Sequence, residues 1–246
     1  MMKHQAAPLA VNPLILSLAA AALVASAEAG EVAEWKFDDP PGTSLKSSAN
    51  SVSGGGAWSA NFDTTVTDGS GKLISKKPSG GIWNTYYRLP DNAPHQLWVV
   101  VELTGWNLNG AKVKEAVRAG FCATDTDDKP MVVAQAVLER KPDGSVSLRG
   151  DALGDGSTGI AGDASPLQQQ QTSPLTIVVG LDQDAGTYSL TTRGTDGATK
   201  ALGTGKTSPG RAAKYVRFSI AGDLTDPEEQ ISIDRIAVTD TDPSAP

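Results

Sequence analysis

The sequence predicts an all-β protein, folded as a two-sheet antiparallel jelly-roll sandwich. Apolar and polar residues alternate with a period of two in several segments, as in strands that bury one face. Turn sequences rich in Gly, Asp and Pro separate roughly a dozen short segments, many at intervals of about 8–12 residues. This rhythm indicates a sandwich or a barrel, and the sequence offers no heptads, no internal repeat and no convincing amphipathic helix.

The segment from Gln96 to Arg149 is the centre of the expected fold. It predicts four strands: Leu97–Trp106, Val117–Ala123, Met131–Glu139 and Ser145–Arg149. Lys141-Pro142-Asp143-Gly144 is a turn sequence that closes the last hairpin. The alternation divides the side chains between two faces: Trp98, Glu102, Gln135 and Glu139 on one concave surface, and Val99, Val101, Ala134 and Leu138 toward the core.

The flanking sequence completes the sandwich. The further expected strands are Glu31–Asp38, Trp58–Phe62, Lys72–Ile74, Leu175–Leu181, Thr187–Arg193, Lys200–Leu202, Tyr215–Ile220 and Gln230–Asp240. The inner faces are expected to carry Val99, Val101, Val132, Ala134, Leu138, Ile177, Val179, Val216, Phe218 and Ile220. Residues 150–174 predict a long loop that is either mobile or functional. Ala111–Arg118 predicts either a short helical piece or the run-in to a strand.

Residues 1–29 predict a secretory signal. Lys3 precedes an apolar run over Leu14–Ala25, and Ala27-Glu28-Ala29 fits a cleavage site. The alternative, a membrane anchor, is disfavoured because the run is shorter than the roughly 20 residues needed to span a bilayer. We therefore expect one exported domain over 30–240, without stable membrane insertion, secreted to the extracellular space or the periplasm. A polar tail follows over 241–246.

Charge and cysteine content narrow the partners and the source of stability. The formal net charge of −7 argues against nucleic acid or an anionic membrane as a partner, because both need a basic surface. Cys122 is the single cysteine, so an intrachain disulfide is impossible. We expect it to be a buried, inert thiol, and stability to come from a large core or a bound ion.

Short motifs at both ends carry a resemblance to a known superfold. Trp35-Lys36-Phe37-Asp38-Asp39-Pro40-Pro41-Gly42-Thr43 resembles the opening of bacterial laminin-G-like domains of the concanavalin A-type lectin/glucanase superfold. Ile233-Asp234-Arg235-Ile236-Ala237-Val238 is similar to their final strand, which pairs beside the first. The resemblance implies a curved jelly roll, often with a structural calcium ion and often with sugar bound on the concave sheet. It does not imply catalysis.

Carbohydrate recognition is the leading hypothesis for function. Exposed aromatic rings stack on sugar faces while neighbouring polar groups bond the hydroxyls, so the expected partner is a polysaccharide or oligosaccharide. The candidate ligand-binding residues are Trp83, Tyr86, Tyr87, Arg88, Trp98, Glu102, Gln135 and Glu139. For Trp98 and Trp106 a core position is an equal alternative, because tryptophan buries a large area. A structural or adhesive module without a glycan ligand is a further alternative.

Two enzymatic alternatives stay open. A glycoside hydrolase needs a pair of acids, and Glu102 with Glu139 is the candidate pair. Alginate-lyase-type jelly rolls place Arg, Gln, His and Tyr on the concave face, and a lyase acting on a uronate polymer is the second alternative. Its candidate residues are His95, Tyr87, Arg88 and Gln135. Arg118 is an alternative to Arg88, and Tyr86 is an alternative to Tyr87.

Calcium is the expected cofactor, in a structural role. Asp38, Asp39 and Asp234 converge if the first and last strands are adjacent, and oxygen ligands suit Ca²⁺. Acidic residues of the long loop, Asp151, Asp155 and Asp163, are a second set. Zinc is disfavoured by the shortage of His and Cys, and the sequence has no nucleotide-binding fingerprint.

Overall fold

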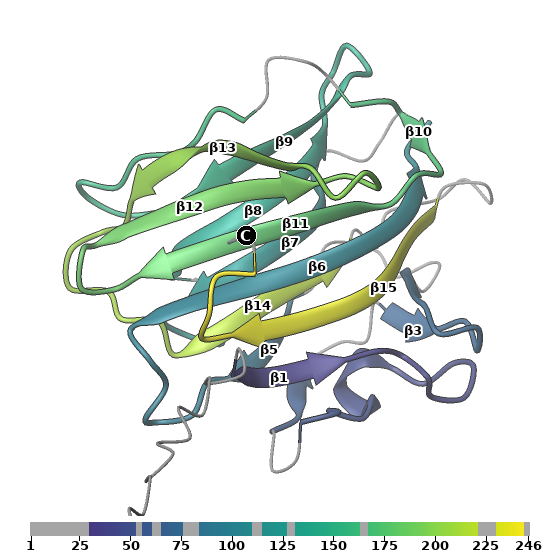
Figure 1. Cartoon of the computed structure of the whole chain (residues 1–246), viewed down its shortest axis with the longest axis horizontal. Helices are drawn as coiled ribbons and strands as arrows, with labels where there is room; N and C mark the ends of the chain where they lie inside the picture. Colours follow the sequence, from purple (N-terminus) through teal and green to yellow (C-terminus); the bar gives the residue numbers. More distant parts are fainter. Residues whose placement is uncertain are drawn as a thin grey trace, which may run out of the picture.

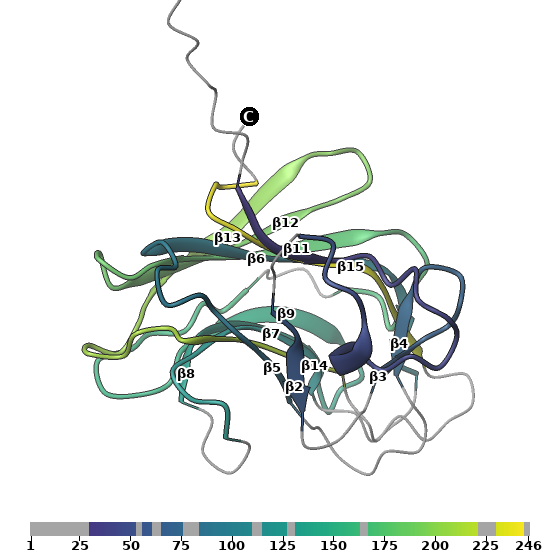
Figure 2. The ribbon, with the colours of Figure 1, turned by 90° about the horizontal axis from the view of Figure 1, so that it is seen from below.

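The structure is a computed structural model, and it describes residues 30–52, 56–60, 65–75, 84–109, 115–126, 131–162, 167–220 and 230–243. The expected secretory signal lies outside these residues. Two antiparallel sheets pack face to face in the described part (Figures 1 and 2). No helix among the described residues is long and apolar enough to cross a membrane.

The larger sheet has nine strands and forms the front layer in Figure 1. Its order is β13 (Thr199–Lys206), β12 (Thr187–Arg193), β11 (Leu175–Asp182), β6 (Gln96–Asn107), β15 (Gln230–Thr239), β4 (Leu73–Ser75) and β3 (Thr65–Thr67). Two strands lie off this path: β1 (Glu31–Trp35) pairs with β15, and β10 (Gln170–Gln171) pairs with β6. The first and last strands are therefore neighbours, as the resemblance implies.

The smaller sheet has six strands. Its order is β2 (Trp58–Ala60), β5 (Thr85–Arg88), β14 (Tyr215–Ile220), β7 (Glu115–Cys122), β8 (Val132–Arg140) and β9 (Val146–Asp151). Figure 2 shows this sheet as an arch whose hollow side faces away from the nine-stranded sheet. The outer face of the six-stranded sheet is therefore the concave surface of the molecule.

The core fills the space between the sheets. Trp35, Trp58, Tyr87 and Phe218 pack as one aromatic group, with the Trp35 and Trp58 ring centroids 4.8 Å apart. The predicted core residues belong to this cluster, with the exception of Val132. Val132 is buried on the outer side with Cys122, because a register shift beside Phe121 gives β8 one extra residue there.

The predicted strands are present, with ends displaced by a few residues, and the all-β sandwich is confirmed. The piece over 150–174 contains β10, and backbone bridges join Gly150 to Ile160 and Val146 to Leu167. The segment around Ala111–Arg118 enters the strand β7 at Glu115, while residues 110–114 lie outside the described part.

The expected sharing of one concave surface by β6 and β8 is wrong. The alternation is correct for the four residues expected in the core, since Val99, Val101, Ala134 and Leu138 all face it. However, β6 belongs to the nine-stranded sheet and β8 to the six-stranded sheet. Two strands that face each other across one core point their polar sides in opposite directions.

Arg235 fastens the two terminal strands to the middle of the nine-stranded sheet. Its guanidinium contacts Glu31 and Glu34 of β1, each at 2.6 Å, and Glu102 of β6 at 3.1 Å. We call these four residues the Arg235 cluster. Burial raises the pKa of Glu34, but hydrogen bonds from Ser51, Lys36 and Arg235 outweigh it and lower that pKa to about 2.

Candidate functional site

Polar and charged side chains gather on the concave outer face of the six-stranded sheet. Strand register places them in two rows that cross the sheet. One row is Tyr86, Arg217, Gly120, Gln135 and Asp151, and the next is Ser219, Arg118, Val137 and Arg149. Residues in register on neighbouring strands share a face, so the backbone alone brings these side chains together.

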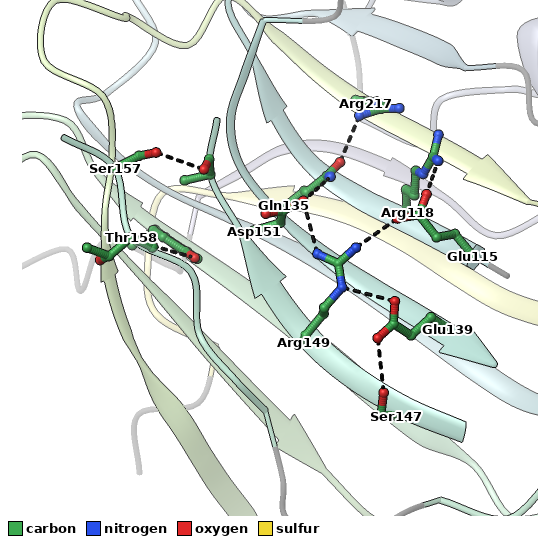
Figure 3. Close-up of polar contacts among 12 residues, drawn as sticks. Glu115, Arg118, Gln135, Glu139, Ser147, Arg149, Asp151, Ser157, Thr158 and Arg217 are labelled. Carbon is green, nitrogen blue, oxygen red and sulfur yellow. Dashed lines mark hydrogen bonds and ion pairs between the residues drawn. The ribbon is translucent and has the colours of Figure 1, made fainter. Parts of the chain in front are cut away.

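Arg149 is the centre of a group of ion pairs on this face (Figure 3). Its guanidinium contacts Glu115 at 2.7 Å, Glu139 at 3.1 Å and Asp151 at 3.0 Å. We call these four residues the Arg149 cluster. All four side chains are partly exposed.

Arg118 extends the cluster toward the middle of the sheet. It contacts the second carboxylate oxygen of Glu115 (Figure 3). Burial, together with the neighbouring charges of Arg217 and Arg149, lowers the pKa of Arg118 to about 10. The guanidinium stays charged at neutral pH, because this pKa is still well above 7.

Arg217 supports the face from below. Arg217 is only 3% exposed. Nε donates to Asn84 Oδ1 at 2.7 Å, and Nη1 donates to Gln135 Oε1 at 2.8 Å. Gln135 in turn donates to Asp151 at 3.4 Å, which joins the buried arginine to the Arg149 cluster. Both of these hydrogen-bond acceptors are neutral amide oxygens, and the Cys122 thiol is a further partner of Arg217.

Gly120 makes the bond between Arg217 and Gln135 possible. These two residues flank Gly120 from the strands on either side, so their backbones are about 10 Å apart. Only long side chains that pass over the intervening strand bridge that distance. A Cβ at position 120 would lie 2.2 Å from the carbonyl oxygen of Ala134, so no other residue fits there without a shift.

An aromatic pair borders the two rows. The rings of Tyr86 and Tyr215 meet edge to face with centroids 6.4 Å apart, next to Cys122. Burial raises the pKa of the Cys122 thiol to about 11, so the thiolate is scarce at neutral pH. The interpretation of Cys122 as a buried, inert thiol agrees with this environment.

The structure brings together only some of the residues singled out from the sequence. Gln135, Glu139, Arg118 and Tyr86 all lie on the concave face. Trp98 and Glu102 lie on the outer face of the other sheet, so Glu102 and Glu139 do not flank one glycosidic bond.

The other candidates are placed apart from this face. Tyr87 points into the core against Trp35 and Trp58. Arg88 is exposed and pairs with Asp91. His95 contacts Asp184 at 2.6 Å next to the nine-stranded sheet, and Trp83 lies outside the described residues. The lyase set of His95, Tyr87, Arg88 and Gln135 is therefore not assembled as expected.

No group of three or more His, Cys, Asp or Glu residues is placed to hold a metal ion within the described ranges. Asp39 accepts a hydrogen bond from the backbone of Ala49, and Asp151 is paired with Arg149. Calcium at Asp38, Asp39 and Asp234 stays a prediction. Asp163 of the second set lies outside the described residues.

The sequence reasoning missed Arg149, Arg217 and Glu115, and it named Asp151 only as a candidate calcium ligand. Arg217 lies in a largely apolar strand, between the core residues Val216 and Phe218, and this position drew no attention to it. A charged residue at the outward position of such a strand was the available signal, because a buried charge needs partners that the fold must supply. Its partners come from β8 and from Asn84, far away in the sequence.

Comparisons with known proteins bear on the fold. No protein-family model matches the sequence, and neither does any curated protein. A lectin from Bauhinia forficata, solved in complex with GalNAc, has a TM-score of 0.50 and 9% identity, covering 74% of this chain and 91% of its own. A xylan β-1,4-xylosidase from Bacillus halodurans has a TM-score of 0.50 and 10% identity, covering 84% of this chain and 38% of its own.

A third similar structure is a β-1,3-glucanase from Mycobacterium marinum, with a TM-score of 0.49 and 14% identity, covering 85% of this chain and 98% of its own. The likeness to the Bauhinia forficata lectin and to part of the xylosidase, each with a TM-score of 0.50, gives the chain the concanavalin A-like lectin/glucanase fold, a jelly-roll sandwich. At these identities the likeness extends to the fold alone.

Proposed function

We propose that this protein binds a polysaccharide on the concave outer face of its six-stranded sheet. The observation that carries the proposal is the Arg149 cluster with the adjoining Arg118. Sugar hydroxyls both donate and accept hydrogen bonds, and this face offers guanidinium donors beside carboxylate acceptors. Arg118 and Arg149 are held at surface positions by Glu115, so they need little ordering when a ligand arrives.

Two further points support a glycan ligand. The groups lie on paired strands, which hold side chains more rigidly than loops do. The fold is also that of the Bauhinia forficata lectin solved with GalNAc and of the xylosidase. The proposal includes export of the protein, because residues 1–29 have the pattern of a secretory signal.

A uronate lyase is the second candidate function. Arg118, Gln135 and Tyr86 lie on the concave side of the sheet with Arg217, and Arg118 is the partly exposed member of this group that a carboxylate ligand would meet. In β-elimination a base removes the proton at C5, a C4=C5 double bond forms, and the C4–O bond breaks while the departing oxygen takes up a proton. The nearest tyrosines to this group are Tyr86 and Tyr215, whereas His95 lies by the other sheet.

Affinity electrophoresis of the purified protein tests the proposal. Gels containing a neutral polysaccharide (galactomannan, arabinoxylan or laminarin) or a uronate polymer (alginate or polygalacturonate) are compared with a gel without polysaccharide. We expect retardation by at least one polymer, and a loss of affinity of about tenfold or more in Arg118→Gln. Arg193→Gln, the same substitution on the other sheet, is the matched control and leaves the retardation unchanged.

Product assays on the same mixtures separate the two candidates. Retardation without new ends supports binding alone. New ultraviolet absorbance from an unsaturated product on a uronate polymer establishes the lyase instead. If no polymer retards the protein, or if Arg118→Gln and Arg193→Gln behave alike, the concave face is not the binding site.

A further inference from the structure

A second ordered surface lies on the opposite side of the sandwich, on the outer face of the nine-stranded sheet. Register places two adjacent rows across four strands. One row is Trp98, Gly180, Ser189 and Thr204, and the other is Gln96, Asp182, Thr187 and Lys206. Four strands at the usual spacing extend about 14 Å, enough for about two sugar rings. The strand labels in Figure 1 locate this surface on β6, β11, β12 and β13.

The Trp98 indole lies across Gly180. A Cβ at position 180 would come within 2.7 Å of the indole Nε1 and 2.6 Å of the Ser189 hydroxyl. Because Gly180 has no side chain, the indole ring has room to lie over the backbone at this position. Trp98 is partly exposed, whereas Trp35, Trp58 and Trp106 are buried, and no described residue accepts a hydrogen bond from its N–H.

The polar rim beside Trp98 is fixed before any ligand arrives. Gln96 donates to one oxygen of Asp182 at 2.8 Å, and the backbone N–H of Ala185 donates to the other at 2.8 Å. These two bonds lower the pKa of Asp182, with the Ala185 N–H as the larger cause. A held carboxylate therefore stands beside an exposed aromatic ring, and its remaining lone pairs accept hydroxyl protons.

These residues line an open hollow of about 260 Å³, somewhat below the usual volume range of small-molecule pockets. Its lining includes Trp98, Gln96, Asp182, Thr187, Ser189 and Thr204. An aromatic platform with hydroxyl, amide and carboxylate groups around it matches the two kinds of surface on a pyranose. A pyranose has an apolar ring face and a polar edge.

We propose that this hollow is a second glycan-binding site, separate from the concave face and selective for neutral sugars. Trp98 stacks on the ring, and Asp182 accepts hydrogen bonds from ring hydroxyls. Neutral sugars are favoured because Asp182 repels a uronate carboxylate. With one site on each outer face, a single molecule is able to hold two glycan segments at once.

Trp98→Ala and Trp98→Tyr test the proposal in gels containing galactomannan, arabinoxylan or laminarin. We expect Trp98→Ala to lower the affinity for at least one of these polymers by about tenfold or more. Trp98→Tyr keeps a ring at the surface and retains most of the affinity. Asp182→Asn, which retains the side-chain shape, weakens binding as well. Binding of the same polymer changes the tryptophan fluorescence of the wild type and leaves that of Trp98→Ala unaltered.

Arg118→Gln separates this proposal from the proposed function of the concave face. This variant alters only the concave face, so we expect it to retain the binding that depends on Trp98. The second site is therefore testable even if the concave face binds nothing. Equal affinity of wild type and folded Trp98→Ala for all three polymers overturns the proposal, as does a wild type that none of them retards. Equal losses in Trp98→Ala and Trp98→Tyr overturn it too. A change from dimer to monomer in Trp98→Ala identifies the face as a contact between copies instead.

Discussion

The Arg149 cluster and the Arg235 cluster are built from the same parts. Each has one arginine, 26% exposed in Arg149 and 22% in Arg235, in contact with three carboxylates. Each joins three neighbouring strands of one sheet. They lie on opposite outer faces of the sandwich, so the molecule uses one arrangement twice.

The two clusters differ in what surrounds them. In the Arg235 cluster, Glu34 has a second cationic partner, Lys36 at 2.9 Å, and the cluster holds the first and last strands together. The Arg149 cluster opens into Arg118 and, through Gln135, into Arg217. We infer that the Arg235 cluster, at the chain ends, stabilises the fold. The Arg149 cluster adjoins further arginines on the concave face, so its groups are placed to contact a ligand.

The largest effect is expected from Arg235→Gln. This change leaves Glu31, Glu34 and Glu102 close together without their shared cation, and Glu34 is nearly buried. We expect the free energy of unfolding to fall by about 3 kcal/mol, at the low end for broken buried pairs because Arg235 is partly exposed. Urea unfolding measures it, with Arg193→Gln as a control within about 0.5 kcal/mol. A loss of free energy of unfolding below about 1 kcal/mol would contradict the structural role of the cluster.

Acid is expected to weaken the Arg235 cluster through Glu34. Its pKa in the folded protein is about 2, against an ordinary value of 4.5. A lowered folded pKa stabilises the protein above the ordinary pKa, and this contribution is lost as the pH falls from about 4.5 toward about 2. We expect a loss of up to about 3 kcal/mol over that range, seen in urea unfolding at stepped pH. Glu34→Gln should flatten this part of the profile, and an unchanged slope would contradict the assignment.

The smallest effect is expected from calcium, which stays a prediction from the terminal aspartates. Because the Arg235 cluster already joins the chain ends, we expect the ion to add about 1 kcal/mol when free calcium is about five times its dissociation constant. EDTA should lower the melting temperature by about 2–4 °C, with recovery in Ca²⁺ better than in Mg²⁺. Asp234→Asn should blunt the response. An unchanged melting curve in protein shown to be metal-free would refute the calcium site.

The sequence was sufficient for most of the strands, though not for β3, β5 and β10, and for the side of each predicted strand that faces the core, except beyond bulges. Alternation is local, so it assigns Val99 and Ala134 to the interior without knowledge of any partner strand. It carries no information on which sheet a strand joins. The sheet that a strand joins depends on its pairing partners, such as β15 for β6, which are distant in the chain. Because β6 and β8 join different sheets, Trp98 and Gln135 lie on opposite sides of the molecule.

Bulges account for the remaining differences in facing. Strict alternation places Trp106 on the same side as Trp98, but Leu103 pairs with Ile233 and Gly105 with Ser232, so β6 has an extra residue at Thr104. Beyond it Trp106 turns into the core, where its N–H donates to Gln168. A single inserted residue reverses every later side chain of a strand, and a pattern of period two does not locate it.

The most direct test of the account compares Arg149→Gln with Arg235→Gln in the same two measurements. The variants remove the same kind of side chain, with similar exposure and the same number of acidic partners. We predict that Arg149→Gln lowers the affinity for the retarding polysaccharide by about tenfold or more, while folded Arg235→Gln binds like the wild type and loses stability. Equal affinity losses in the two variants, or a loss confined to Arg235→Gln, would contradict a binding site on the concave face.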